Sequence, residues 1–137
     1  MSREDQLAEI FVYGTLRKGF VPHSYLHGWS VRFLGEGTIA GILYDLGEYP
    51  GAVPSDDPDN EIRGELYELT DPENQLRVLD GIEEFDSAQP ETSLFVRKSA
   101  RVRLRTGKEV AAWVYFLPRK PRNARLIASG DFAAAHS

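Results

Sequence analysis

Two neighbouring glutamates, Glu83 and Glu84, follow an amphipathic segment, and Glu83 is the candidate for proton transfer. Residues 72–82 predict a helix with a proline in its first turn. Thr70 and Asp71 both suit the N-cap position, and the sequence does not choose between them. The helix therefore presents the glutamates at its carboxyl end.

Helical periodicity gives these two glutamates opposite environments. The apolar stripe of the predicted helix consists of Leu76, Val78, Leu79 and Ile82. Glu83 falls between the two leucines of this stripe, whereas Glu84 falls with Arg77 and Asp80 on the solvent side. Burial destabilises a charged carboxylate, so we expect the pKa of Glu83 to rise and to suit proton transfer near neutral pH. The alternative is that Glu83 ends a fraying helix and swings into solvent.

A short loop after an apolar run is the second candidate site. Its residues are Tyr13, Gly14, Thr15, Leu16 and Arg17. The glycine permits a backbone geometry in which successive N–H groups converge on an anion such as a carboxylate. An ordinary turn after a strand explains the same residues. A Walker phosphate loop is excluded, because GxxxxGK[ST] does not occur in the sequence.

The other chemistry-bearing residues do not form a recognisable catalytic set. The histidines, which lack the spacing of a metal site, are His23, His27 and His136. Cysteine is absent and no GxSxG motif occurs, so thiolate chemistry and a serine elbow are excluded. We expect no metal and no cofactor. Three arginines are candidates for binding substrate carboxylates, although solvated arginines on a strand face are commoner: Arg17, Arg97 and Arg101.

Short apolar runs between turn residues predict strands around the helix. The predicted strands are residues 10–13, 38–46, 62–69, 94–104 and 110–117. In the run 94–104 alternate side chains share a face, and the Thr-Gly-Lys at 106–108 predicts a hairpin to the next run. The turn-rich residues 55–60 predict a solvated loop. A mainly antiparallel sheet follows.

Length and charge limit the architecture and the partners. The chain has 137 residues and 42% hydrophobic residues, which predicts one domain over residues 1–137. Its 21 acidic and 16 basic residues give a net charge of −5, which argues against a nucleic-acid surface. No apolar run approaches the roughly 20 residues of a membrane-spanning helix, and the first ten residues are too charged for a signal peptide. We expect a cytoplasmic protein without a membrane partner, and its oligomeric state stays open.

The order of several segments resembles the gamma-glutamylcyclotransferase-like family, which includes the gamma-glutamylamine cyclotransferases and plant avirulence-induced relatives. The segments that carry this resemblance are FVYGTLRKG at 11–19, GILYDLGEYPGAV at 41–53, IRGELYEL at 62–69, VLDGIEEFD at 78–86, FVRKSARVRL at 95–104, AAWVYF at 111–116 and SGDF at 129–132. They span most of the chain, and their order is more specific than any one motif.

The resemblance implies a fold and a site. The fold is α+β, a small mixed and mainly antiparallel β-barrel with flanking helices. The YGTL loop, here Tyr13 to Leu16, is expected to bind the substrate's alpha-carboxylate through backbone amides, and Glu83 is expected to transfer protons. Three positions depart from the family pattern: Glu84 replaces a small residue, Phe95 replaces a tyrosine, and SGDF replaces an SGDW-like ending. The departures put leaving-group specificity in doubt, and Glu84 near the site favours a cationic amine.

The implied reaction cyclises a gamma-glutamyl amide or peptide. The alpha-amine of the glutamyl group attacks its own gamma-carbonyl and releases 5-oxoproline and a free amine, so the nucleophile belongs to the small-molecule substrate. This chemistry needs no Ser or Cys nucleophile, metal or cofactor. Three alternatives stay open. The first is a non-catalytic module that binds gamma-glutamyl or amino-acid ligands, and the second is a hydrolase that releases glutamate. The third is a structural or interaction protein with a vestigial pocket, and the retained YGTLR and Glu83 weigh against it. The sequence does not identify the amine.

Overall fold

The computed structural model describes residues 7–13, 31–46, 50–57, 59–82 and 84–130. The elements within these ranges are β1 (Glu9–Val12), β2 (Val31–Asp45), β3 (Pro50–Pro54), β4 (Glu61–Leu69), α2 (Pro72–Ile82), a 3-10 turn η2 (Pro90–Thr92), β5 (Val96–Leu104), β6 (Glu109–Phe116) and β7 (Arg125–Leu126). The structure has no helix, within the described ranges, that is long and apolar enough to cross a membrane.

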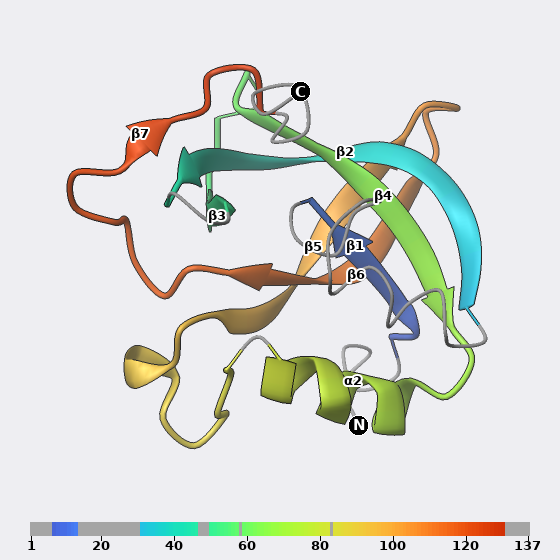
Figure 1. Ribbon diagram of the computed structural model, residues 1–137. Coiled ribbons are helices and arrows are strands. Elements are labelled where there is room, and N and C mark those ends of the chain that lie inside the picture. Colours follow the sequence, from blue (N-terminus) through green and yellow to red (C-terminus); the bar gives the residue numbers. More distant parts are fainter. Residues whose placement is uncertain (1–6, 14–30, 47–49, 58, 83, 131–137) are drawn as a thin grey trace.

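Five strands form a closed mixed barrel (Figure 1). The hydrogen-bonded order is β2-β4-β1-β6-β5, and pairing of β5 with β2 closes the circle. The β1–β6 pair is parallel and the other four neighbouring pairs are antiparallel. Closure satisfies backbone groups that an open sheet would leave at its edges. The expected fold class is confirmed.

The predicted strands are all present, with shifted ends, and two further strands were not predicted. The strand expected from residue 38 begins at Val31, because β2 is a long curved strand that pairs with β4 along its first ten residues. The unpredicted β3 is bounded by two prolines, which suit an edge strand whose N–H groups are not all needed. β7 has only two residues and makes no periodic pattern.

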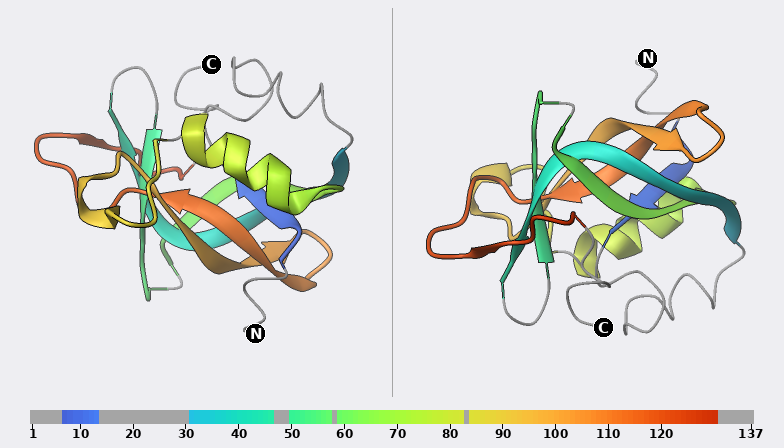
Figure 2. Two further views of the ribbon diagram at one scale, coloured as in Figure 1. Left: turned by 90° about the horizontal axis from the view of Figure 1, so that it is seen from below. Right: turned by 90° about the horizontal axis from the view of Figure 1, so that it is seen from above.

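The barrel strands have apolar side chains on two sides. Phe11, Val114 and Phe116 belong to the cluster inside the barrel, together with Ile39 and Ile62. The intervening residues of β1 and β6 point the other way and form a second cluster beneath α2. That cluster contains Ile10, Val12, Tyr67, Leu69, Leu76, Leu79, Phe95, Tyr115 and Leu117. The helix therefore lies across the outside of the barrel over these strands (Figures 1 and 2).

The helix begins and ends where the sequence predicts. The N–H of Gln75 donates to the carbonyl of Asp71, and the side-chain oxygen of Gln75 accepts from the N–H of Asp71, so Asp71 is the N-cap residue. Leu76 and Leu79 are buried as expected, but the inclusion of Val78 in the buried stripe is wrong because its side chain is 44% exposed. On the helical wheel, Val78 lies outside the stripe of residues that contacts the barrel.

The placement of Asp80 on the solvent side is also wrong. Its side chain is 22% exposed and bonds to Arg97 and Tyr115 of the barrel. A wheel marks polar residues as solvent-facing, but it has no information about donors on other strands. Asp80 is thus a carboxylate held at the edge of the helix–barrel interface.

The chain leaves α2 through a Schellman motif. The N–H of Phe85 donates to the carbonyl of Asp80 and that of Glu84 donates to Gly81, at N···O distances of 2.8 and 3.3 Å. Glu84 has a φ of +54°, at the position where glycine is usual. The departure noted at Glu84 therefore puts a side chain where a left-handed backbone is required.

Glu84→Gly is expected to stabilise the protein. Removing the side chain relieves a left-handed strain of about 1–2 kcal/mol. The greater conformational freedom of glycine in the unfolded chain offsets roughly half of this stabilisation. For each kcal/mol by which the free energy of unfolding rises, we expect the melting temperature to rise by about 2–4 °C, measured by calorimetry. Asn123→Gly is the control, because Asn123 also has a positive φ of 57° but is a residue type that tolerates it. An unchanged or lower melting temperature for Glu84→Gly contradicts this account.

Candidate functional site

The structure describes one residue of the predicted site directly. Tyr13 is the residue after β1, and its side chain is buried. The remaining loop residues Gly14, Thr15, Leu16 and Arg17, and the candidate Glu83, lie outside the described residues. The roles expected of them stay predictions. Their described neighbours are Tyr13 on one side and the end of α2 on the other.

The Tyr13 hydroxyl joins the residue after β1 to two other strands. It donates to the backbone carbonyl of Tyr115 in β6 at 2.5 Å and accepts from the N–H of Ala52 in β3 at 3.2 Å. Inside a protein such bonds satisfy groups that have no access to water. The strand end that leads to the predicted loop is therefore held from two sides.

Asp80 is the centre of a second polar group. Its Oδ1 accepts from the hydroxyl of Tyr115 at 2.6 Å and from Nε of Arg97 at 2.8 Å. Its Oδ2 accepts from Nη2 of Arg97 at 3.2 Å. The paired bonds to one guanidinium fix the orientation of the carboxylate as well as its charge. Arg97 also lies over the ring of Trp113, 4.4 Å from its centroid, in a cation–π contact.

The β5–β6 hairpin brings these groups together. Its register puts Arg97 opposite Tyr115 and Ser99 opposite Trp113. Residues that face each other across two strands share a side of the sheet, and the diagonal neighbour is within reach of a long side chain. Arg97 therefore reaches Trp113 diagonally, and both Arg97 and Tyr115 point toward α2. The predicted hairpin is confirmed, with Gly107 at a φ of +92° in its turn.

Two of the three candidate arginines have partners of their own. Arg97 is engaged by Asp80 and is neither a solvated arginine nor, in this conformation, free for a substrate. Arg101 is exposed and lies 3.9 Å from a carboxylate oxygen of Glu109. The third candidate, Arg17, lies outside the described residues. The structure thus supports the solvated alternative for Arg101 only.

Sequence reasoning missed the roles of Asp80 and Tyr115. A signal for Tyr115 was present, because a tight turn at 106–108 sets which residues of the hairpin face each other. Counting back from that turn puts Tyr115 opposite Arg97. The contacts of Asp80 had no comparable signal in the sequence, because its partners lie in the β5–β6 hairpin and not in its own helix.

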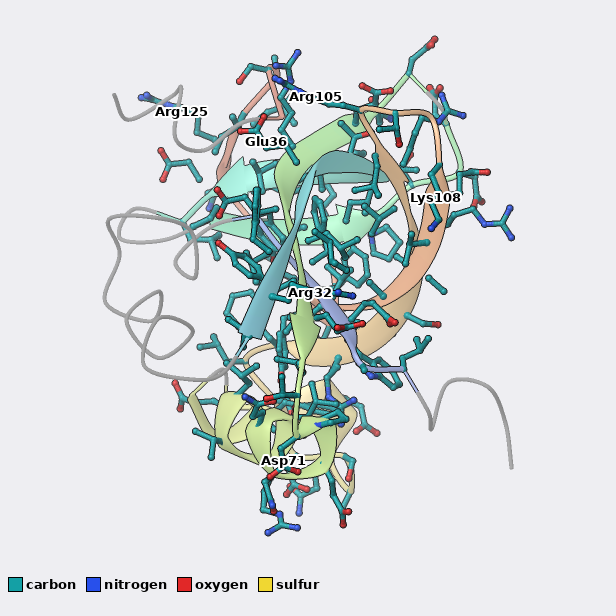
Figure 3. All side chains as sticks on the ribbon, turned by 90° about the vertical axis from the view of Figure 1, so that its right-hand side faces the viewer. Arg32, Glu36, Asp71, Arg105, Lys108 and Arg125 are labelled. Carbon is teal, nitrogen blue, oxygen red and sulfur yellow. The ribbon has the colours of Figure 1, made fainter. Side chains whose placement is uncertain are left out.

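One of the hollows among the described residues adjoins these groups, and another lies away from them. One, of about 620 Å³, lies beside α2 and is lined by residues that include Leu76, Arg77, Asp80, Arg97 and Trp113. The other, of about 420 Å³, lies at the opposite end of the barrel, where Figure 3 shows Glu36 and Arg105 far from Asp71.

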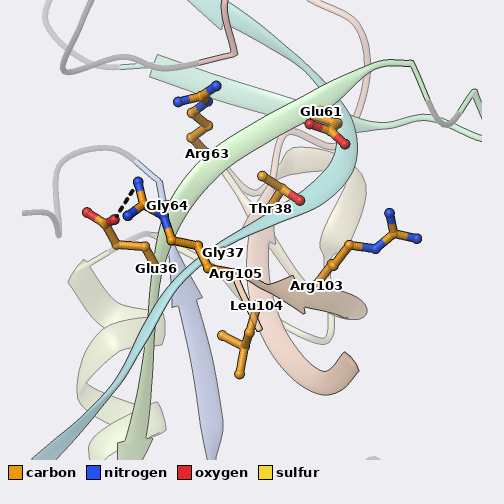
Figure 4. A pocket seen from close by; sticks show the side chains of 9 residues that line it. All are labelled: Glu36, Gly37, Thr38, Glu61, Arg63, Gly64, Arg103, Leu104 and Arg105. Carbon is orange, nitrogen blue, oxygen red and sulfur yellow. Dashed lines mark ion pairs between the residues drawn. The ribbon is translucent and has the colours of Figure 1, made fainter. Parts of the chain in front are cut away.

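In the second hollow Arg105 is paired with Glu36, and the guanidinium groups of Arg63 and Arg103 point away from each other (Figure 4). This hollow does not present converging donors. The described part of the chain contains no group of three or more metal-ligating side chains, and the three histidines lie outside it.

The sequence over residues 10–134 matches the family described as gamma-glutamyl cyclotransferase, AIG2-like. The chain belongs to this family. It is a cyclotransferase enzyme of that family, and its barrel is the fold of the family's solved structures. The resemblance inferred from the motif order is confirmed.

Named relatives cover nearly all of the chain. A protein of Methanocaldococcus jannaschii with the provisional name gamma-glutamylcyclotransferase is 33% identical over 124 residues, 90% of this chain and 93% of that protein. The gamma-L-glutamyl-butirosin B gamma-glutamyl cyclotransferase of Niallia circulans is 32% identical over 114 residues, 82% of this chain and 69% of the relative. A solved AIG2-like protein of Mus musculus superposes with a TM-score of 0.68 at 28% identity, covering 84% of this chain and 80% of that one.

Tyr13→Phe is expected to destabilise the protein by about 1–3 kcal/mol, because it leaves the N–H of Ala52 and the carbonyl of Tyr115 without the hydroxyl that bonds them. Urea unfolding followed by circular dichroism measures this change. Tyr44→Phe is the control, since Tyr44 is buried to the same degree and the described residues provide no bond to its hydroxyl. Equal losses in the two variants contradict the role given to the Tyr13 hydroxyl.

Proposed function

We propose that this enzyme cyclises a small gamma-glutamyl amide or peptide to 5-oxoproline and a free amine. The observation that carries the proposal is the match to the family over residues 10–134. The structure supports it by placing the strand end at Tyr13 and the end of α2 on one hydrogen-bonded strand, β6. These two ends lead to the loop and to the glutamate that the sequence marks for binding and proton transfer.

The reaction balances without water. The ammonium of the glutamyl group loses a proton to Glu83, and the free amine attacks the gamma-carbonyl carbon of the same molecule. A carbon–nitrogen bond forms to close the lactam, and the bond to the leaving nitrogen breaks. Glu83 returns its proton to the departing nitrogen. The ring nitrogen loses its second proton through the same carboxylate to the released amine, which leaves as an ammonium ion. The enzyme contributes mainly by holding amine and carbonyl together, which raises their effective concentration.

The N–H groups of the loop after Tyr13 are proposed to bind the substrate's alpha-carboxylate. The residues assigned to this task are Tyr13, Gly14, Thr15, Leu16 and Arg17. Backbone donors that converge at the end of a strand bind a carboxylate without a metal. Glu84, next to the proton carrier and exposed, is proposed to favour an amine that carries positive charge.

Glu83→Gln is expected to keep the fold and substrate binding and to abolish turnover, because an amide cannot accept the ammonium proton. Mass spectrometry of 5-oxoproline after incubation with a panel of gamma-glutamyl amines and dipeptides measures the reaction. Calorimetry of the variant with the preferred substrate measures binding. Glu84→Gln is the matched control. It is expected to keep releasing 5-oxoproline, with a higher KM only for substrates whose leaving amine carries positive charge.

Each other outcome has a defined meaning. Near-native turnover by Glu83→Gln contradicts the assignment of that residue. Glutamate in place of 5-oxoproline identifies a hydrolase, in which water attacks the gamma-carbonyl. Binding to the wild type without any product identifies a binding module.

A further inference from the structure

One chain of hydrogen bonds joins the end of β1 to the last turn of α2. The hydroxyl of Tyr13 bonds the backbone carbonyl of Tyr115, and the hydroxyl of Tyr115 bonds Oδ1 of Asp80. The backbone carbonyl of Asp80 then accepts from the N–H of Phe85, beyond the helix. Tyr115 therefore bonds both Tyr13, which precedes the predicted loop, and the last turn of α2, and it does so from a buried strand.

The position of Asp80 is unfavourable for a carboxylate that has no partner. It lies in the last turn of α2, where the negative end of the helix dipole disfavours a carboxylate, and this turn contains no basic residue. Arg97 supplies the opposing charge from β5, with its own side chain 19% exposed. Three hydrogen bonds from β5 and β6 thus hold a carboxylate that is unfavourable at this end of its own helix.

We infer that Asp80, Arg97 and Tyr115 form a positioning unit for the cyclisation, which sets the carboxylate at position 83 relative to the loop that follows Tyr13. The inference rests on the proposed function of Glu83. None of the three residues is given contact with substrate, so each acts through the segments that it holds. Position 83 follows Asp80 by three residues, about one helical turn, so an anchor at Asp80 limits how far the helix end can move.

The reaction makes such an anchor valuable. The amine, the gamma-carbonyl and the proton carrier must meet within a few tenths of an ångström, and a misplacement of about 1 Å can cost a factor of roughly 100 in rate. Helix ends open more readily than helix centres. A last turn held to the sheet by a charged and a neutral donor keeps that motion small.

Tyr115→Phe and Asp80→Asn test the unit, because both variants keep the size of the side chain. Tyr115→Phe also keeps the backbone carbonyl that bonds Tyr13. We expect kcat for 5-oxoproline release to fall about 10- to 100-fold, with KM within about threefold of wild type, at a temperature at which circular dichroism shows both variants folded. An unchanged kcat in folded Tyr115→Phe overturns the inference.

Matched controls separate positioning from general stability. Tyr67→Phe also removes a hydroxyl from a buried tyrosine beneath α2, one that bonds Glu65 at 3.2 Å. Glu73→Gln removes a carboxylate on α2 that lies 3.9 Å from Arg77 at the surface. Both controls are expected to keep kcat within twofold of wild type. Equal falls in kcat for a control and its test variant overturn the inference.

A double variant tests whether the effect passes along the hydrogen-bonded chain. Tyr13→Phe and Tyr115→Phe break consecutive bonds of one chain, so their effects on kcat are expected to be less than multiplicative when combined. Independent, fully multiplicative effects contradict a shared positioning role.

Amide hydrogen exchange gives a readout that needs no activity. In Tyr115→Phe and Asp80→Asn the N–H of Phe85, which bonds Asp80, is expected to exchange at least tenfold faster than in wild type, while Tyr67→Phe leaves it unchanged. If wild type releases no 5-oxoproline, the proposed function fails and exchange alone decides whether the unit holds the helix end. Unchanged protection of Phe85 in both test variants overturns the inference.

Discussion

The barrel depends on a close approach of two strands at Gly37. Here β2 meets β5 through the pairs Gly37–Leu104 and Thr38–Arg103, and this junction closes the circle of five strands. A Cβ at Gly37 would lie 2.8 Å from the carbonyl oxygen of Arg103, nearer than such atoms pack. A side chain there would force the strands apart. Without closure, β6 would still pair with β1, but the β5–β6 hairpin would lose its second attachment, to β2, and the groups that meet beneath α2 would be held from one side only.

The position of β1 and β6 between the barrel core and α2 explains the polar contacts near them. Both strands are covered inside by the barrel core and outside by α2, so their polar side chains must find partners within the protein. The Tyr13 hydroxyl satisfies this requirement with the carbonyl of Tyr115 and the N–H of Ala52, and the Tyr115 hydroxyl satisfies it with Asp80. The need to satisfy buried hydroxyls thus ties together the two segments from which the proposed site is built.

The sequence predicted the elements better than the contacts between them. The helix over 72–82 and the hairpin around 106–108 are local, because caps, turn residues and periodicity lie within a few residues of what they determine. The short β3 and β7 have too few residues for a pattern. The role of Asp80 depends on donors 17 and 35 residues away in sequence, which a helical wheel does not contain. Its assignment to solvent failed for that reason, whereas the two leucines that face the barrel were placed well.

Two acidic departures from simple helix rules occur at the same helix end, and they have different physical outcomes. Asp80 opposes the helix dipole but gains three donors from the barrel, so its position is stabilised by tertiary contacts. Glu84 adopts a left-handed backbone and has an exposed side chain, and its backbone bonds to Gly81 and Leu94 would be equally available to glycine. The fold therefore requires the backbone geometry at position 84 but not its carboxylate. A charge that the fold does not need, beside the proposed proton carrier, supports the proposal that the leaving amine is cationic.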